Sequence, residues 1–526
     1  MKNWFQSMRK YQWAIFSGVL IGTSYIPFPP WAVLFCYAPL LFWANSPDRS
    51  LKEVFWGGWW TQFVLTLIGF HWIAYTANEF AYIPWPLAIL ILFIFSSLMH
   101  IYIPLALVLG KKFFKPYFLL AAPLLLSLAE RYYPAIFQWH LGYTYHYAGL
   151  PIFHFADIIG TAGLSTLTLL CSGFWAWWWP RRKDPQTQSR KWAATVLTLF
   201  IALNILGSFY GQKWNQTDST LQVSLIQANI GNLEKVYAEQ GRAYQASIVS
   251  RFLELTQKQI QQQKSDLIIW PETAFPDFLD SHLLERKHTQ QLVNGLFPLD
   301  TPLMTGAYSK DPQSDGSVEQ STYNALFLVR PDGTSFSPPY RKTHLLAFGE
   351  YLPLSERFPI LLKWLPFVSN FGRGLGPSVL SLQRENQPDL NFGGQICYES
   401  LYPHFSRELA KKGSHFLVNV TNDSWFGRPF EPYQHMYMTL ARGLENRRPV
   451  LRSTNTGVST VMLANGKVLE QSPLHQEWAG HYNVPYLSEP PVTFYTQWGH
   501  FDFLVYIVIL IVLLIKGLGY AKSRNA

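Results

Sequence analysis

The residue types that could do chemistry in this chain begin with one thiol. Cys397 lies in NFGGQICYES, where an apolar strand is expected to end and a helix-prone stretch to begin. A side chain at such a corner projects from the sheet edge, and nearby backbone N–H groups can point at the group it attacks. Cys36 and Cys171 fall inside apolar stretches, so Cys397 is the thiol expected to meet polar substrates. The alternative is a small buried side chain, which free cysteines often are.

A carboxylate and an ammonium group stand in comparable places. Glu272 follows the apolar run of DLIIWPETAFP, where burial at a strand end could raise its pKa and make it a proton acceptor. Lys342 lies in PPYRKTHLLAFGEYLP, where a fixed positive charge could stabilise an oxyanion. Taken singly, each also fits a plainer role: a solvated turn carboxylate, or a surface lysine lying over an apolar loop.

The composition indicates that these residues share the chain with a membrane-embedded part. Of the 526 residues, 49% are hydrophobic and 14% are charged, whereas soluble proteins carry about 25% charged residues. Aromatic residues make up 17% of the chain, which argues against a disordered protein. The net charge of +9 fits either nucleic acid or a membrane surface, and the placement of the charges decides between them.

Eight apolar stretches divide the sequence. They cover residues 11–26, 31–44, 54–74, 87–108, 117–129, 160–179, 192–210 and 501–518. A spanning helix needs about 20 mostly apolar residues, so the third, fourth, sixth, seventh and eighth stretches are predicted to span. The other three are short or interrupted by proline.

The basic residues then predict a sidedness. If the N-terminus is cytoplasmic and all eight stretches span, the cytoplasmic segments hold 16 lysines and arginines and the short outer loops hold only Arg131. This asymmetry follows the positive-inside rule, so no nucleic-acid partner is needed to explain the charge. Both termini are then cytoplasmic, and the region from about residue 211 to 490 lies outside the cytoplasm.

The outer region alternates between predicted strands and helices. Strands are expected at 221–230, 266–270, 302–308, 323–330, 391–397 and 415–421, and helices at 241–263 and 403–412. This alternation favours a layered α/β architecture. The expected domains are a seven-helix transmembrane domain over residues 1–210, an extracytoplasmic catalytic domain over 211–490, and a C-terminal transmembrane helix with a cytoplasmic tail over 491–526.

The motifs occur in an ordered set. WPE, YRKxHLxxFGEYLP and GxxICYE follow one another, accompanied by TNDSWFG at residues 421–427 and RPVLRSTNTG at 448–457. The set resembles the nitrilase superfamily, and with seven apolar stretches before it and one after it the whole chain resembles the apolipoprotein N-acyltransferase family. The resemblance implies a multi-pass α-helical membrane domain joined to a nitrilase-like αββα sandwich.

The resemblance also implies roles for individual residues. Cys397 would be the nucleophile, Glu272 the general base, and Lys342 the group that stabilises the tetrahedral intermediate. Supporting roles fall to Glu350, Tyr398 and Glu399. Candidate substrate-binding residues are Tyr237, Trp364, Asn422 and Trp425. The tryptophan that the family usually carries after a lysine is Val236 here, which follows Lys235, and Tyr237 is the candidate to replace it.

The implied reaction moves an acyl chain from a membrane phospholipid to the α-amino group of the diacylglyceryl-cysteine of an apolipoprotein, by ping-pong kinetics through a thioester on Cys397. No cofactor and no metal are implied, and we expect a monomer in the inner membrane. Two alternatives stay open: a membrane-tethered amidohydrolase with the same triad, and a transporter or receptor with an extracytoplasmic binding domain. Against the latter, Glu79 and Glu130 lie near the ends of predicted spans rather than at their centres.

Two further expectations concern less specific features. The apolar segment 358–368 (FPILLKWLPFV) is too short to span, so we expect it to enter the lipid interface as a lid or acyl guide. His435 is expected on the buried face of a helix. The spacing of His140, His146 and His154 fits no closed metal site.

Overall fold

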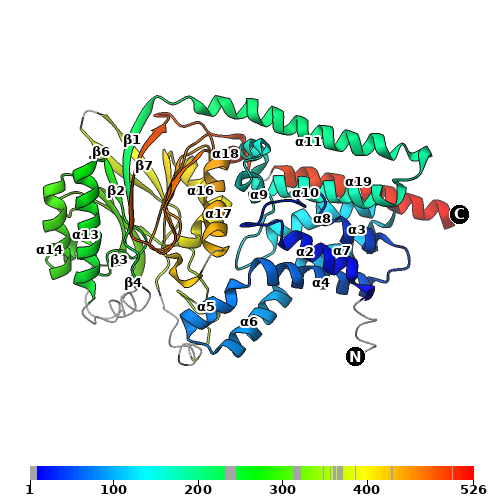
Figure 1. The fold of residues 1–526 in the computed structure, drawn as a ribbon, viewed down its shortest axis with the longest axis horizontal. Coiled ribbons are helices and arrows are strands. Elements are labelled where there is room, and N and C mark those ends of the chain that lie inside the picture. Colours follow the sequence, from blue (N-terminus) through cyan, green and yellow to red (C-terminus); the bar gives the residue numbers. More distant parts are fainter. Residues whose placement is uncertain are drawn as a thin grey trace. The chain divides into compact units, whose positions relative to one another are not determined.

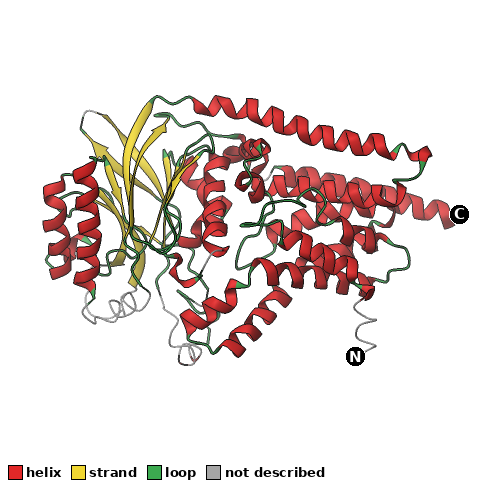
Figure 2. Ribbon diagram, viewed as in Figure 1, coloured by secondary structure: helices red, strands yellow, loops and turns green. Residues whose placement is uncertain are grey.

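The computed structural model divides the chain into two compact units. It describes residues 9–231, 244–311, 322–347, 349–355, 357–358, 360, 363, 371–385, 387–427, 430–499 and 501–525. The first unit, called the helical unit below, consists of Met1–Gln212 and Trp498–Ala526, and the second, the α/β unit, is Lys213–Gln497. Figure 2 shows that the strands gather in the α/β unit.

The helical unit is built from apolar helices. They are α2 Gln12–Gly22, α3 Ala38–Asn45, α4 Leu51–Gly69, α5 Trp72–Ala81, α6 Trp85–Leu98, α7 Tyr102–Phe113, α8 Phe118–Tyr132, α9 Tyr143–Tyr147, α10 Ala156–Arg181, α11 Ser189–Gln212 and α19 Asp502–Asn525. Among the described residues, four helical segments are long and apolar enough to cross a membrane: Trp85–Phe113, Pro151–Arg181, Ser189–Asn215 and Asp502–Gly519. These segments correspond to the fourth, sixth, seventh and eighth apolar stretches.

The third stretch, over 54–74, was predicted to span the membrane, and its helix ends before the stretch does. Helix α4 ends at Gly69 and α5 begins at Trp72, with a turn at Phe70 and His71 between them. The sequence is apolar through the break, so hydropathy alone does not mark it. Helix α4 is 19 residues long, and it is not among the four candidate spans. The three shorter stretches correspond to α2, α3 and α8, which have 11, 8 and 15 residues.

The α/β unit contains two six-stranded sheets. One has the order β12-β1-β2-β3-β4-β5 and the other β11-β10-β9-β8-β7-β6. The strands of the first sheet are β1 Ser219–Gln227, β2 Leu267–Ile269, β3 Leu303–Lys310, β4 Thr322–Val329, β5 Tyr340–Arg341 and β12 Trp478–Tyr486. Those of the second are β6 Val379–Arg384, β7 Gln387–Ile396, β8 Phe416–Thr421, β9 Val450–Thr454, β10 Thr460–Met462 and β11 Val468–Gln471. The strands expected from the sequence are therefore present.

Helices cover both outer faces of the paired sheets. Figure 1 shows α13 (Gln245–Gln262) and α14 (Lys287–Leu296) beside the first sheet, and α16 (Pro403–Lys411) and α17 (Phe430–Asn446) beside the second. A short helix, α18 (Phe494–Trp498), lies at the end of the unit. This layering is the αββα sandwich that the resemblance to nitrilases implied, so the expected fold is confirmed.

Parallel pairing brings several strand ends to the same edge of each sheet. Strand β2 runs parallel to β1 and β3, and β8 runs parallel to β7 and β9. In register, Ile396 pairs with Val420, and Thr421 pairs with Thr454. The segments that follow these carboxyl ends carry polar side chains, which is where α/β sheets place their ligands. The motifs of the sequence fall on these ends.

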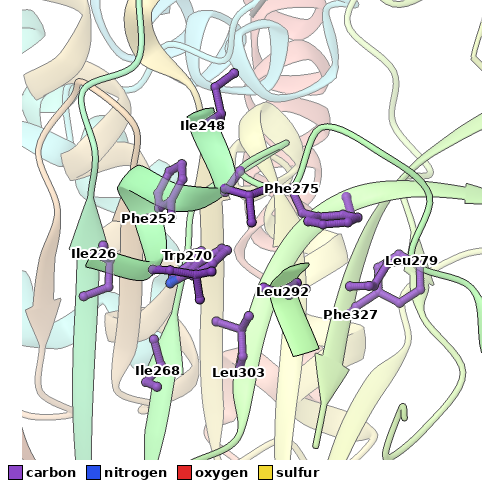
Figure 3. Packing of buried hydrophobic residues seen from close by; sticks show 14 of the residues in the cluster. Ile226, Ile248, Phe252, Ile268, Trp270, Phe275, Leu279, Leu292, Leu303 and Phe327 are labelled. Atoms are coloured by element: carbon purple, nitrogen blue, oxygen red, sulfur yellow. The ribbon is translucent and has the colours of Figure 1, made fainter. Parts of the chain in front are cut away.

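The hydrophobic core beneath α13 and α14 fixes the backbone that carries Glu272. Trp270 is fully buried, its ring stacks on Phe252 at 4.9 Å between centroids, and its Nε1 donates to Thr256 Oγ1 at 2.9 Å. Figure 3 shows both rings among aliphatic side chains from the sheet and the two helices. Truncating a buried tryptophan costs about 3–5 kcal/mol. The buried Trp270 side chain therefore fixes the backbone just before Glu272.

Candidate active site

Three strand ends deliver the predicted catalytic residues. Glu272 comes three residues after β2, Lys342 directly follows β5, and Cys397 directly follows β7. All three side chains are buried, with exposed fractions of 6%, 1% and 6%. The strands β2 and β5 belong to one sheet and β7 to the other, so the site is assembled between the two sheets.

Lys342 lies between two carboxylates. Its Nζ is 3.2 Å from Glu272 Oε1 and 2.8 Å from both carboxylate oxygens of Glu350. Burial lowers the pKa of Lys342, but Glu272 and Glu350 outweigh burial and raise that pKa well above its usual value. The side chain is therefore a permanent ammonium ion whose position is fixed from two sides.

Hydrogen-bond donors orient Glu272 as well. Asn324 Nδ2 donates to Glu272 Oε1 at 2.8 Å and to Glu350 Oε1 at 3.0 Å, and the backbone N–H of Asn422 donates to Glu272 Oε2 at 3.0 Å. The backbone N–H of Leu346 donates to Glu350 Oε2 at 2.9 Å. The two carboxylates, the lysine and the asparagine thus form one network with a defined geometry.

Cys397 occupies a strained corner of the backbone. It begins a 3-10 turn, Cys397–Leu401, and its φ of +54° is a conformation that non-glycine residues rarely adopt. Burial, followed by Glu272, raises the pKa of Cys397 well above its usual value, while Lys342 opposes this rise. The resting thiol is therefore protonated at neutral pH, and its attack on a carbonyl needs a base.

Glu399 ties the nucleophile turn to the lysine loop. Its Oε1 accepts from the backbone N–H groups of Thr343, at 2.7 Å, and His344, at 3.0 Å, and from the Tyr340 hydroxyl. Its Oε2 accepts from the backbone N–H of Ile396 at 2.8 Å. Burial raises the pKa of Glu399 to about 7, although Lys342 and these donors act in the opposite direction. Glu399 therefore connects the segment that carries Lys342 to the turn that carries Cys397.

Comparison with known proteins agrees with this geometry. Residues 222–479 match the model of the carbon-nitrogen hydrolase family, and residues 17–174 match that of the apolipoprotein N-acyltransferase N-terminal domain. An apolipoprotein N-acyltransferase of Bdellovibrio bacteriovorus is 53% identical over 100% of this chain and 98% of its own length. The chain belongs to the apolipoprotein N-acyltransferase family. It is accordingly an enzyme, an N-acyltransferase.

More distant proteins share parts of this similarity. An apolipoprotein N-acyltransferase of Geobacter metallireducens is 29% identical over 89% of this chain and 88% of its own. A nitrilase-superfamily protein of Saccharomyces cerevisiae covers 51% of this chain and 91% of its own, with 16% identity and a TM-score of 0.37.

Behind the nucleophile of this acyltransferase lies a second buried network. Tyr398 stacks on His435 of α17, with ring centroids 4.5 Å apart, and its hydroxyl donates to Glu431. His435 Nδ1 is 3.0 Å from Asp423 Oδ1, and Asp423 Oδ2 accepts from Arg452 at 2.7 Å. His435 is buried on its helix, as the sequence predicted.

Three members of this network could in principle hold a metal ion. Asp423, Glu431 and His435 offer ligand atoms within 4.8 Å of one another, the one such group among the described residues. Each of the three already contacts a protein group: Arg452 for Asp423, Tyr398 for Glu431, and the Cys397 carbonyl for His435. A guanidinium beside the ligand oxygens opposes a cation, so we assign the cluster to the protein's own hydrogen bonds.

The remaining predicted residues fall in different places. Asn422 lies directly after β8, where its backbone N–H holds Glu272 and its Oδ1 accepts from Ser424 and Asn455. Trp425 is half-buried in the short 3-10 turn Asp423–Trp425. Tyr237 and Trp364, with most of the apolar segment 358–368, lie outside the described residues. Substrate binding by these four residues stays a prediction.

Asn324 is a site residue that the sequence analysis missed. It lies within β4, in the run TYNALFLV, and its side chain points to the carboxylate pair rather than to solvent. A single polar residue inside an otherwise apolar strand is a weak signal, but it is the signal that could have identified it.

Proposed function

We propose that the chain transfers an acyl group from a membrane phospholipid to the α-amino group of the diacylglyceryl-cysteine at the N-terminus of an apolipoprotein. The observation that carries the proposal is the buried Glu272–Lys342 pair beside a protonated Cys397 at a strained turn. A carboxylate base, an ammonium ion and a thiol in this arrangement suit acyl transfer through a thioester.

In the first half-reaction Glu272 takes the thiol proton as Cys397 Sγ attacks the ester carbonyl of the phospholipid. The S–C bond forms, and the negative charge on the carbonyl oxygen is stabilised by Lys342 and by the backbone N–H of Tyr398, the residue after the nucleophile. The C–O bond then breaks, and the lysophospholipid leaves with the proton from Glu272. The acyl group stays on Cys397 as a thioester.

In the second half-reaction the lipoprotein amine attacks the thioester. The N–C bond forms and the S–C bond breaks, Glu272 accepts a proton from the amine, and that proton returns to the Cys397 sulfur. Lys342 and the Tyr398 N–H stabilise the same oxyanion position in both steps. Removing one such donor typically costs about 3 kcal/mol of transition-state stabilisation.

We further propose that residues 1–210 and 491–526 are membrane-embedded and that residues 211–490 face the periplasm, with both termini in the cytoplasm of the inner-membrane enzyme. The four apolar helices and the family membership support a membrane-bound enzyme. Both substrates are lipids, so a site on the outer face gives them access. The enzyme is proposed to act as a monomer.

Mass spectrometry of the acyl-enzyme tests the proposal. Purified protein is incubated with phospholipid, and the peptide that contains Cys397 is examined for the mass of one acyl chain, with Cys397→Ala as control. We expect the adduct on the wild type, and its rapid discharge by a diacylated lipopeptide but slow discharge by water. Rapid discharge by water would favour an amidohydrolase, and no adduct at Cys397 would refute the mechanism.

A further inference from the structure

The carbonyl oxygen of Cys397 receives three side-chain contacts. Asn419 Nδ2 donates to it at 3.0 Å, Ser400 Oγ at 3.2 Å, and His435 Nε2 lies at 3.3 Å. A carbonyl oxygen has two lone pairs, so the donors from Asn419 and Ser400 are enough to saturate it. The carbonyl belongs to the same peptide group as the N–H of Tyr398, and a hydrogen bond at one end of a peptide strengthens the donor at the other.

Each contact leads back to one fully buried guanidinium. Arg452 Nη1 donates to Asn419 Oδ1, and Asn419 in turn donates to the Cys397 carbonyl. Arg452 Nη1 also donates to Thr439 Oγ1 at 3.3 Å, and Thr439 Oγ1 is 2.7 Å from Ser400 Oγ. Arg452, Asn419, Thr439 and Ser400 have no exposed surface.

Chemistry fixes the direction of the hydroxyl chain. The guanidinium can only donate and the carbonyl can only accept. Thr439 Oγ1 therefore accepts from Arg452 and donates to Ser400, and Ser400 donates to the Cys397 oxygen. Every hydrogen bond in the chain points toward the carbonyl, so their polarisation adds.

The third arm runs through Asp423 and His435. Both nitrogens of His435 face acceptor oxygens, so both contacts are hydrogen bonds only when the ring carries two protons. Burial, followed by Arg452, lowers the pKa of His435, whereas Asp423 raises it. The net shift in pKa disfavours the doubly protonated ring, so Asn419 and Ser400 are the donors that polarise the carbonyl.

We propose that Arg452 is a positioning residue that acts on the reaction through Asn419 and the Thr439–Ser400 chain. It polarises the Cys397–Tyr398 peptide, and the Tyr398 N–H becomes a stronger donor to the oxyanion. This inference rests on the proposed function, because it needs an oxyanion on the acyl group carried by Cys397. It also gives the RPVLRSTNTG motif a role in catalysis.

Single substitutions can interrupt the hydrogen-bond chain from Arg452 to Cys397 at a point away from the substrate. Thr439→Val removes a hydroxyl that touches neither Cys397 nor Tyr398 in the hydrogen-bond network, and Thr439→Ser keeps that hydroxyl. Ser400→Ala removes the last link. Thr289→Val is the matched control, because Thr289 is equally buried on α14, where its hydroxyl donates to Phe278 O. Full-length protein in proteoliposomes is assayed for kcat and KM with a diacylated lipopeptide.

We expect Thr439→Val and Ser400→Ala to lower kcat about 3- to 10-fold, with KM changed less than about twofold, while Thr439→Ser and Thr289→Val stay near wild type. In the acyl-enzyme made with a 13C-labelled acyl chain, the thioester carbonyl band should move to higher wavenumber in the first two variants, since its oxygen accepts a weaker hydrogen bond. A merely structural role would not move that band.

An unchanged kcat in Thr439→Val and Ser400→Ala would overturn the proposal, and so would a thioester band at the wild-type position in both. Equal losses in Thr439→Val and Thr439→Ser would also overturn it, because the hydroxyl would then be irrelevant. Failure of the proposed function is distinct, because the wild type itself would then form no thioester on Cys397.

Discussion

At the scale of single residues, the site is organised around a shared cation. Lys342 is held by two carboxylates at once, so Glu272 does not have to be both the lysine's sole counter-ion and the base. Glu350 also pairs with the Lys342 ammonium. Glu272 could therefore accept a proton and lose its charge without leaving that buried ammonium unpaired. A buried charge without a partner costs several kcal/mol. We therefore propose that Glu350 supports the reaction by sharing the charge of Lys342.

Asn324 bridges these two carboxylates, so its loss should lower the rate at which Cys397 is acylated. In Asn324→Ala, Glu272 and Glu350 lose the amide donor that they share, so their carboxylates are held less firmly in position. We expect the acylation rate of Cys397 to fall about 10- to 100-fold, with little loss of thermal stability. Single-turnover acylation by phospholipid measures this.

The matched control is Asn294→Ala, since Asn294 is exposed on α14. It should acylate at the wild-type rate. An Asn324→Ala protein that also acylates at the wild-type rate would show that the bridge has no catalytic role.

Glu399 should make the stability of the α/β unit depend on pH. Its pKa of about 7 in the folded protein lies above the ordinary value of 4.5. The stabilisation from this group is therefore complete below pH 4.5 and is lost as the pH rises to about 7, by an amount on the order of 3 kcal/mol. Unfolding midpoints of wild type and Glu399→Gln, measured from pH 5 to 8, test this.

The comparison between the two proteins isolates the group, because every other titrating residue is common to both. The wild type should lose more stability than Glu399→Gln as the pH rises through this range. Parallel curves for the two proteins would show that Glu399 does not titrate there.

At the scale of elements, the site depends on strands that end together and on backbones that approach closely. Gly306 of β3 is one such approach. A Cβ at this position would lie 2.6 Å from the backbone N of Thr273 and 2.7 Å from Glu272 Cα. The neighbouring atoms are backbone, so they cannot turn away as a side chain would.

Gly306→Ala should therefore displace the segment that carries Glu272, the proposed general base. We expect a loss of about tenfold or more in acylation rate, together with a lower unfolding midpoint. Gly231→Ala is the control, because a Cβ there meets no atom within 4 Å. Wild-type activity in Gly306→Ala would mean that β3 does not set the position of Glu272.

The position of a residue within its element decides whether its role could be predicted from the sequence. Glu272, Lys342 and Cys397 each follow a short apolar run and sit in a contiguous motif, so their places at strand ends could be inferred. Asn324 is different: it lies within a strand, and its role arises only when β4 lies beside β5 and the loop that carries Glu350. The Arg452 network likewise joins residues from four separate segments, which no local pattern connects.

Helix ends in the helical unit were the least predictable feature. Apolar residues continue on both sides of His71, yet α4 stops at Gly69. Hydropathy indicates whether a segment favours lipid or water, whereas a helix ends where its backbone hydrogen bonds stop. At this end Gly69 packs closely against Trp139, since a Cβ at Gly69 would lie 2.9 Å from that ring.

At the scale of the whole molecule, the distribution of charge predicts how the protein lies in its membrane. Sixteen basic residues fall on the proposed cytoplasmic side and one in the short outer loops. The most basic of these regions is the end of α10 and the connection that follows it, with Arg181, Arg182 and Lys183. The opposite orientation would place this cluster outside, against the positive-inside rule.

Engineered cysteines can test this orientation because the native cysteines are buried, with exposed fractions of 0%, 9% and 6% for Cys36, Cys171 and Cys397. Ser281 is exposed in the α/β unit, and Lys183 is exposed in the basic connection. In spheroplasts, a membrane-impermeant maleimide should label Ser281→Cys directly but Lys183→Cys only after permeabilisation. Unmodified protein, treated in the same way, measures background labelling. Labelling of Lys183→Cys in intact spheroplasts, with Ser281→Cys protected, would place the catalytic residues on the cytoplasmic side, where a lipoprotein already carried across the membrane could not reach Cys397.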